Sequence, residues 1–248
     1  MAGSAGPAMV AGVEIGLDLV AGNPNLTFIF FIALVLLAVL GFRFGLYAFL
    51  NRQQSDLDDQ RRIWSRLVVV GALAAVFAGL GLLEIVTSIR APYKQGLMVG
   101  LVVALTLSLR TLYYSAVPSG STDGDGTLLA GVGGVAAVVV FVGIAVVGPH
   151  PALTALAGIG TILFAVYGVL FGRRGAAATR VQGTVVDTLL RHLLPVLLFA
   201  AMVPVVALAV LAGLDRAVVL HVQVVFIIMT ATSLMTATIK LRQNLAGL

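Results

Sequence analysis

Seven long apolar segments constrain this chain more than any other feature of its sequence. Each is long enough to cross a bilayer, because about 20 apolar residues, at about 1.5 Å per residue in a helix, span the hydrocarbon. The segments are Leu26 to Leu50, Leu67 to Ile89, Leu97 to Val117, Leu128 to Val147, Ala152 to Phe171, Leu189 to Leu211 and Val218 to Ile239. The apolar runs are continuous instead of alternating with period two, which favours helices over a β-barrel. We therefore expect an all-α membrane protein built as a seven-helix bundle.

The composition supports a membrane protein and excludes several kinds of site. Of the 248 residues, 60% are hydrophobic and 10% are charged, against about 25% charged residues in soluble domains. The chain has no cysteine, which excludes disulfides, thiolate metal sites and a cysteine nucleophile. The net charge of +5 is better explained by membrane topology than by nucleic-acid binding. We expect a multi-pass protein of the cell membrane whose first partner is the lipid bilayer and which does not bind nucleic acid.

The chain divides into a short leader and one membrane domain. Residues 1–25 are rich in Gly and Ala and are expected to form an extracellular tail, with a short interfacial helix as the alternative. No Lys or Arg precedes the apolar part of Met1 to Pro24, so we expect no cleavable signal peptide. Residues 26–245 form the single seven-helix domain.

The basic residues predict the orientation, because Lys and Arg concentrate in short cytoplasmic loops. With the N-terminus outside, twelve of the fifteen lie near inner ends of the segments and three near outer ends. The inner group is Arg43, Arg52, Arg61, Arg62, Arg66, Arg110, Arg173, Arg174, Arg180, Arg191, Lys240 and Arg242. The outer group is Arg90, Lys94 and Arg216. We therefore predict an extracellular N-terminus and a cytoplasmic C-terminus.

The hydrophilic connections are short. Asn51 to Arg66 mixes aspartates with arginines, carries the only tryptophan, Trp64, and is expected to be a solvated cytoplasmic linker. Pro118 to Gly126 is predicted to be a flexible cytoplasmic turn, and Gly148 to Pro151 a short helix-breaking hairpin on the outside.

Small residues and prolines within the segments indicate how the helices pack. Gly71, Ala75 and Gly79 repeat every four residues, and small residues let helix backbones approach closely in lipid. We interpret these glycines as structural. Pro195 and Pro204 are expected to bend the sixth segment or to free a carbonyl group for a neighbour.

The second half of the chain contains two predicted helices whose sequences and connecting loop resemble those of a known family. Ala155 to Gly172 reads ALAGIGTILFAVYGVLFG, and Thr188 to Val206 reads TLLRHLLPVLLFAAMVPVV. With the VLFG ending, the loop length, the Leu-Leu-Arg opening and the mid-helix proline, this pair resembles the fifth and sixth helices of archaeal microbial rhodopsins, the bacteriorhodopsin family. Gly126-Thr127 leading into LLAGVGG resembles the start of that family's fourth helix, and Phe226 onward resembles its seventh. The resemblance extends over residues 26–245 and implies a rhodopsin-like bundle.

The same resemblance implies a retinal-binding lysine near the middle of the last helix, four residues after an aspartate. Counted from Phe226, these two positions hold Leu234 and Thr230, and neither side chain can perform the family's role. The nearest lysine, Lys240, lies nearly two turns closer to the cytoplasm and is interpreted as an interfacial anchor. We expect no covalent retinal, no catalytic, cofactor-binding or metal-binding residue, and leave open a bound lipid or carotenoid.

The third segment also lacks the residues that proton pumping requires. The family's arginine, proton-acceptor aspartate and proton-donor carboxylate fall near Leu97, Gly100 and Thr111, and no acid occurs between Glu84 and Asp123. Titratable groups within a membrane are costly and are kept for use, so their absence argues against a proton pathway. The tryptophans that enclose retinal in the family are also missing.

Glu84 is the one acid inside a predicted segment. We expect it to reach the headgroup region or to pair with Arg90, with a network that includes Lys94 as the alternative.

The remaining ionisable residues are not expected to form a shared catalytic or metal-binding site. His192 and His221 are predicted on opposite sides of the membrane, so they cannot share a metal, and His150 is expected to be solvated. Asp187 precedes Arg191 by four residues and is expected to form a helical ion pair worth a few tenths of a kcal/mol.

The sequence therefore predicts no enzyme, since no phosphate loop, zinc motif or catalytic triad is present. Our first hypothesis is a non-photoactive opsin homologue that acts as an accessory or scaffold subunit, associated with another membrane protein or with itself. The second is a receptor or carrier for a small apolar ligand in the vestigial retinal pocket. The third is a transporter or pore.

Overall fold

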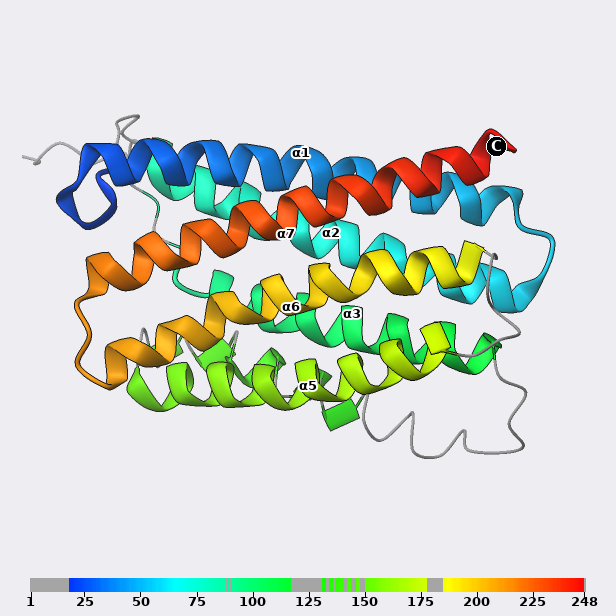
Figure 1. Ribbon diagram of the computed structural model, residues 1–248. Helices are drawn as coiled ribbons and strands as arrows, with labels where there is room; N and C mark the ends of the chain where they lie inside the picture. The colour runs from blue at the N-terminus through cyan, green and yellow to red at the C-terminus, as the bar shows by residue number, and fades with distance from the viewer. Residues whose placement is uncertain are drawn as a thin grey trace, which may run out of the picture.

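The chain folds into long helices that run nearly the full length of the molecule (Figure 1). The computed structural model describes residues 18–87, 89, 91–116, 131–132, 134–135, 137–140, 142–143, 146–147, 150–177 and 185–247. Within these residues, a single 3-10 turn, η1 (Val20–Gly22), precedes six long helices. They are α1 (Pro24–Gln54), α2 (Asp58–Val86), α3 (Lys94–Ala116), α5 (Pro151–Ala177), α6 (Val185–Leu211) and α7 (Arg216–Leu245).

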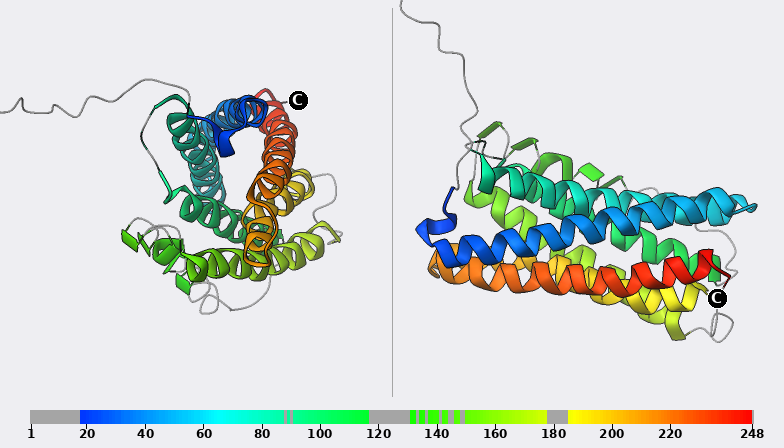
Figure 2. Two further views of the ribbon diagram at one scale, coloured as in Figure 1. Left: turned by 90° about the vertical axis from the view of Figure 1, so that its left-hand side faces the viewer. Right: turned by 90° about the horizontal axis from the view of Figure 1, so that it is seen from above.

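The six helices pack as a closed ring in the order α1, α2, α3, α5, α6, α7, and α3 also contacts α6 across it. Figure 2 shows this ring along the helix axes in its left panel and from the side in its right panel. We call the end where α1 begins the N-side end and the end where α7 finishes the C-side end. Helices α3 and α5 are neighbours that both begin at the N-side end (Figure 1).

Local sequence signals place several of the helix ends. The side chain of Asn23 accepts hydrogen bonds from the backbone N–H groups of Asn25 and Leu26, and Pro24 occupies the first turn of α1. Asp215 caps α7 in the same way. Gly213, with a φ of 88°, ends α6 in the left-handed conformation that glycine adopts without strain.

Six of the seven predicted segments are confirmed as helices, and α6 continues through both of its prolines. The predicted fourth segment, Leu128 to Val147, lies partly outside the described residues, and those described within it are helical. The leader up to residue 17, Arg90, Arg180 and the turn at Pro118 to Gly126 also lie outside the described residues.

The prediction of a solvated linker from Asn51 to Arg66 is wrong, because most of this stretch is helical. Helix α1 continues to Gln54 and α2 begins at Asp58, so only residues 55–57 connect them. Trp64, expected in solvent, is buried in the core together with Ile63 and Leu67. The apolar residues of this stretch recur at helical spacing, and burying one face of the helix outweighs the polarity of the other face.

The outer surface of the bundle is apolar. Large hydrophobic side chains stand exposed on every long helix except α3, among them Phe28, Phe42, Val76, Leu163, Leu198 and Val225. All six helices are long and apolar enough to cross a membrane. A soluble protein rarely exposes so much apolar surface, whereas lipid tails cover it without cost. The described part of the chain is therefore a multi-pass helical membrane bundle.

The glycines of α1 and α2 allow the backbones of these two helices to contact each other. A Cβ atom placed on Gly71 would lie 2.5 Å from the backbone Cα and N atoms of Gly45 and 2.7 Å from the carbonyl oxygen of Gly41. The structural role expected of Gly71 is thus confirmed. A Cβ atom placed on Gly79, two turns further along α2, would have no neighbouring atom within 4 Å.

Candidate functional site

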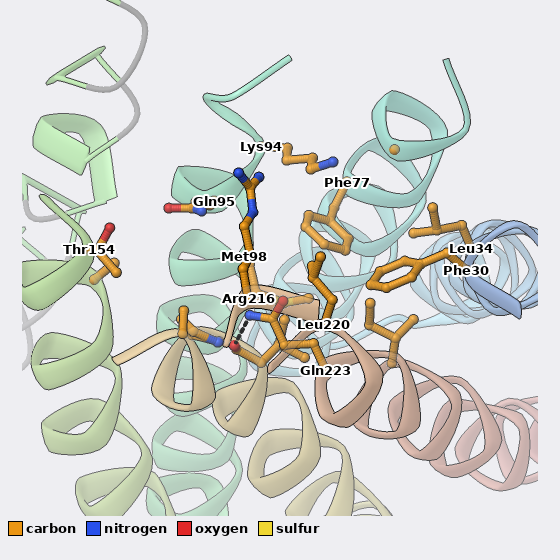
Figure 3. Close-up of a pocket in the computed structure, with 16 residues that line it drawn as sticks. Phe30, Leu34, Phe77, Lys94, Gln95, Met98, Thr154, Arg216, Leu220 and Gln223 are labelled. Carbon is orange, nitrogen blue, oxygen red and sulfur yellow. Dashed lines mark hydrogen bonds between the residues drawn. The ribbon is translucent and has the colours of Figure 1, made fainter. Parts of the chain in front are cut away.

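A cavity of about 170 Å³ lies inside the N-side half of the bundle and is the best candidate for a site (Figure 3). All six long helices contribute to its wall. The sixteen lining residues are Phe30, Leu34, Phe77, Gly81, Lys94, Gln95, Met98, Thr154, Ala157, Val203, Pro204, Ala207, Arg216, Leu220, Gln223 and Ile227. These elements meet here because α1, α3, α5 and α7 begin, and α2 and α6 end, at the N-side end.

The charged residues of the cavity belong to the turns nearest the N-side end. Lys94 and Gln95 occupy the first turn of α3, and Arg216 is the first residue of α7. Figure 3 shows Arg216 extending toward Lys94 and Gln95. The sixteen lining residues include two cations and no carboxylate. The mouth of the cavity is therefore positively charged.

The two cations differ in their partners. Glu84 forms an ion pair with Lys94, and its other carboxylate oxygen accepts a hydrogen bond from the backbone N–H of Ala91 at 2.6 Å. The network with Lys94, which the sequence left as the alternative for Glu84, is thus present. Arg216 forms no ion pair within the described part of the chain, which leaves its guanidinium group available to a ligand.

The rest of the wall is mostly apolar, and one partly buried hydrogen bond joins two of its helices. Gln223 donates its side-chain N–H to the carbonyl oxygen of Val203 at 2.8 Å, which joins α7 to α6 directly before Pro204 (Figure 3). Met98 and Ile227, which also line the cavity, are almost fully buried.

The middle of the bundle beneath the cavity is filled. Thr106 donates a hydrogen bond to the carbonyl oxygen of Phe164 at 3.0 Å and ties α3 to α5. A Cβ atom on Gly168 would lie 2.5 Å from the side chain of Leu197. The interior between α3, α5, α6 and α7 is thus closed by direct packing at this level.

The positions implied by the rhodopsin resemblance do not line the cavity. Thr230 and Leu234 are fully buried in the packed middle of α7, and Thr230 donates its hydroxyl hydrogen to the carbonyl oxygen of Phe226. Thr111 of α3 accepts a hydrogen bond from Arg66 instead of facing the interior cavity. Lys240 lies about 9 Å along α7 from Leu234, toward the C-side end.

The other ionisable residues are placed as the sequence indicates. His192 near the start of α6 and His221 near the start of α7 lie at opposite ends of the bundle. His150 is exposed. Asp187 and Arg191 form the expected ion pair at 2.7 Å. No group of three metal-ligating side chains occurs among the described residues.

Sequence reasoning missed Arg216, Gln95 and Gln223 as site residues. A signal for part of the site was present in α7, where Arg216, Leu220, Gln223 and Ile227 follow one another at helical spacing and share one face. On that face the polar residues Arg216 and Gln223 alternate with the apolar Leu220 and Ile227.

Comparisons with family models, curated proteins and solved structures found no match to this chain.

Proposed function

We propose that this protein is a receptor or carrier that holds a small amphiphilic molecule, with an anionic head and an apolar body, in the N-side cavity. The observation that carries the proposal is the combination, within this one cavity, of Arg216, which has no ion pair in the described structure, with an apolar wall that includes Met98 and Ile227. Ligand sites in proteins are typically concave and apolar, with a few polar groups that fix the orientation of the ligand.

The size of the cavity limits the ligand. An apolar cavity of about 150 Å³ holds a molecule the size of benzene. The 170 Å³ here therefore accommodates one ring or a short acyl segment. A carotenoid, which the sequence left open as a ligand, is too long to be enclosed. A medium-chain carboxylate is the better fit, because only its head and the adjoining acyl segment have to lie in the cavity.

The charge at the mouth favours an anionic head over a neutral one. Arginine binds carboxylates and phosphates through paired hydrogen bonds, and Arg216 has no acidic partner in the described structure. Gln95 and Thr154 add neutral hydrogen-bonding groups at the same level. A carboxylate bound here would lie between α3, α5 and α7.

The packed middle of the bundle argues against a pore, because α3 and α5 meet directly through Thr106 and Phe164. The scaffold hypothesis stays a prediction. One of its motivations is weakened, since Gly41, Gly45 and Gly71 are used within the bundle to join α1 to α2.

We further infer that residues 128–147 form a seventh crossing and that the N-side end faces outward. Because α3 and α5 both begin at the N-side end, the chain between them must return along the length of the bundle. A rhodopsin-like architecture in the cell membrane is compatible with this path. Most of the basic residues lie near the C-side end, as expected for the cytoplasmic side.

Binding of decanoate by the purified full-length protein tests the proposed function. We expect saturable binding of decanoate and binding of decanol that is at least about tenfold weaker, because only the carboxylate engages Arg216. Arg216→Gln is expected to weaken decanoate binding about tenfold and to leave decanol binding unchanged. Isothermal titration in a nonionic detergent measures both.

Filling the cavity provides the second arm of the same experiment. Ala207→Leu places a larger side chain in the wall and should reduce binding of both molecules, whereas Ala209→Leu, on the same helix but outside the lining, should not. Equal affinities of decanoate and decanol, or equal effects of the two leucine substitutions, would contradict the proposal.

Addition of all-trans retinal tests the expected absence of a covalent chromophore. We predict no red-shifted absorption band, because Leu234 occupies the position implied for the Schiff-base lysine and is fully buried. A visible spectrum recorded before and after addition decides this. A stable band that disappears in Lys240→Ala would show that Lys240 binds retinal and that our interpretation of it as an anchor is wrong.

A further inference from the structure

The C-side end carries a second feature that the N-side cavity does not explain. Five arginines gather where α1 ends, α2 begins and α3 approaches its end, and we call them the arginine cluster. They are Arg52, Arg61, Arg62, Arg66 and Arg110. Four of them line an open hollow of about 510 Å³ together with Asp58 and Ser65. The lining thus has four guanidinium groups against one carboxylate.

No member of the arginine cluster forms an ion pair in the described structure, although Asp58 lines the same hollow. The two ion pairs found there, Glu84–Lys94 and Asp187–Arg191, involve none of its members. Arg66 lies within electrostatic reach of both Arg62 and Arg110. Like charges held together next to an apolar core repel one another more strongly than in water, so the arrangement favours a bound anion.

Arg110 is a buried cation with an unpaired hydrogen-bond donor. Its side chain is only 6% exposed, and its Nε is a buried donor without a hydrogen-bond partner, the one such side-chain atom in the described part of the chain. Its guanidinium group lies 5.2 Å from the centre of the Tyr114 ring, a contact that offers the cation no hydrogen-bond acceptor. Buried charges in proteins are normally paired, and an unpaired donor there is costly.

The remaining contacts hold the arginines in position. Arg66 donates through Nη1 to the carbonyl oxygen of Leu107 at 3.0 Å and to the hydroxyl of Thr111. Arg61 donates through Nε to the carbonyl oxygen of Ser55 at 2.8 Å. These bonds fix the side chains and leave other N–H groups of each guanidinium for a ligand.

We propose that the arginine cluster binds a phosphate group at the C-side end of the bundle. Arginine forks match the oxygens of phosphate, and basic pockets between membrane helices on the cytoplasmic side suit anionic lipid headgroups. The phosphate belongs either to the headgroup of an anionic phospholipid or to a free phosphate ion. In both cases it supplies negative charge to the four arginines that line the hollow and offsets the repulsion between Arg66 and Arg110.

Thermal unfolding of the full-length protein in nanodiscs tests this site and separates the two sources. One sample contains phosphatidylcholine alone, a second adds phosphatidylglycerol, and a third adds inorganic phosphate to phosphatidylcholine, with chloride at matched ionic strength as its reference. We expect phosphatidylglycerol, inorganic phosphate or both to raise the Tm by about 5 °C. A rise with the lipid alone assigns the site to a headgroup, and a rise with the ion alone assigns it to free phosphate.

Substitutions of single arginines test whether the rise in Tm comes from binding at the arginine cluster. Arg66→Gln and Arg110→Met are each expected to weaken the apparent affinity for the effective additive at least about tenfold. Arg174→Gln removes an exposed arginine of α5 at the same end and should respond like the wild type. Arg66 is exposed, so its substitution preserves the test where Arg110→Met does not fold. Absence of any Tm rise, or a rise that is the same in all three variants, would overturn the proposal.

Discussion

Gly71→Ala is expected to destabilise the bundle by about 3 kcal/mol, the largest effect of any single-atom addition that the structure indicates. The added Cβ would lie 2.5 Å from backbone atoms of Gly45, and a backbone cannot move aside as a side chain can. Helices α1 and α2 would have to separate, with loss of packing along their whole contact. The free energy of unfolding in mixed micelles measures this cost.

Gly79→Ala is the matched control for this experiment. It makes the same chemical change two turns along the same helix, where nothing lies within 4 Å of the new atom. Because alanine favours a helix over glycine by up to about 1 kcal/mol, we expect no loss of stability and a small gain. Similar losses for Gly71→Ala and Gly79→Ala would show that α1 and α2 do not meet at Gly71.

Asn51→Ala is expected to cost about 2 kcal/mol, because Asn51 joins the last turns of α1 and α7. Its buried side chain donates to the carbonyl oxygens of Tyr47 at 2.8 Å and Leu241 at 3.2 Å, and accepts from the side chain of Asn244 at 2.5 Å. The substitution removes all three bonds. Thermal or denaturant unfolding measures the loss.

A double-mutant cycle separates the Asn51–Asn244 bond from the others. Asn244→Ala alone removes one of the three bonds and should cost less than Asn51→Ala. The double variant is expected to be more stable than the sum of the single losses predicts, by about 0.5 kcal/mol or more. Strict additivity would mean that the two side chains do not interact in the folded protein.

Hydropathy alone predicted six of the helices, because an apolar run of about 20 residues has to satisfy its backbone internally when it crosses lipid. The start of α2 was harder to predict. Charged residues from Asp58 to Arg66 mask a helical pattern in which Ile63 and Trp64 face the core. Their burial depends on the C-side ends of the neighbouring helices, which the sequence does not place.

The cavity could not be predicted for the same reason. Its wall combines two to four residues from each of six helices, so its position depends on their relative shifts and rotations. That Leu234 and Thr230 do not hold retinal stays a prediction from the sequence. The sequence could not show that packed side chains fill the interior around Thr230 and Leu234, or that the cavity lies nearer the N-side end of the bundle. The arginine cluster was visible as charge, but the burial of Arg110 within it was not.

The most direct test of the central claim is a density map of the full-length protein prepared with decanoate. We predict an elongated non-protein feature that lies beside Arg216 in the N-side cavity and contacts Met98 and Ile227. A map in which the cavity is empty at saturating decanoate, or in which the protein's own side chains fill it, would contradict a ligand-binding role for this bundle.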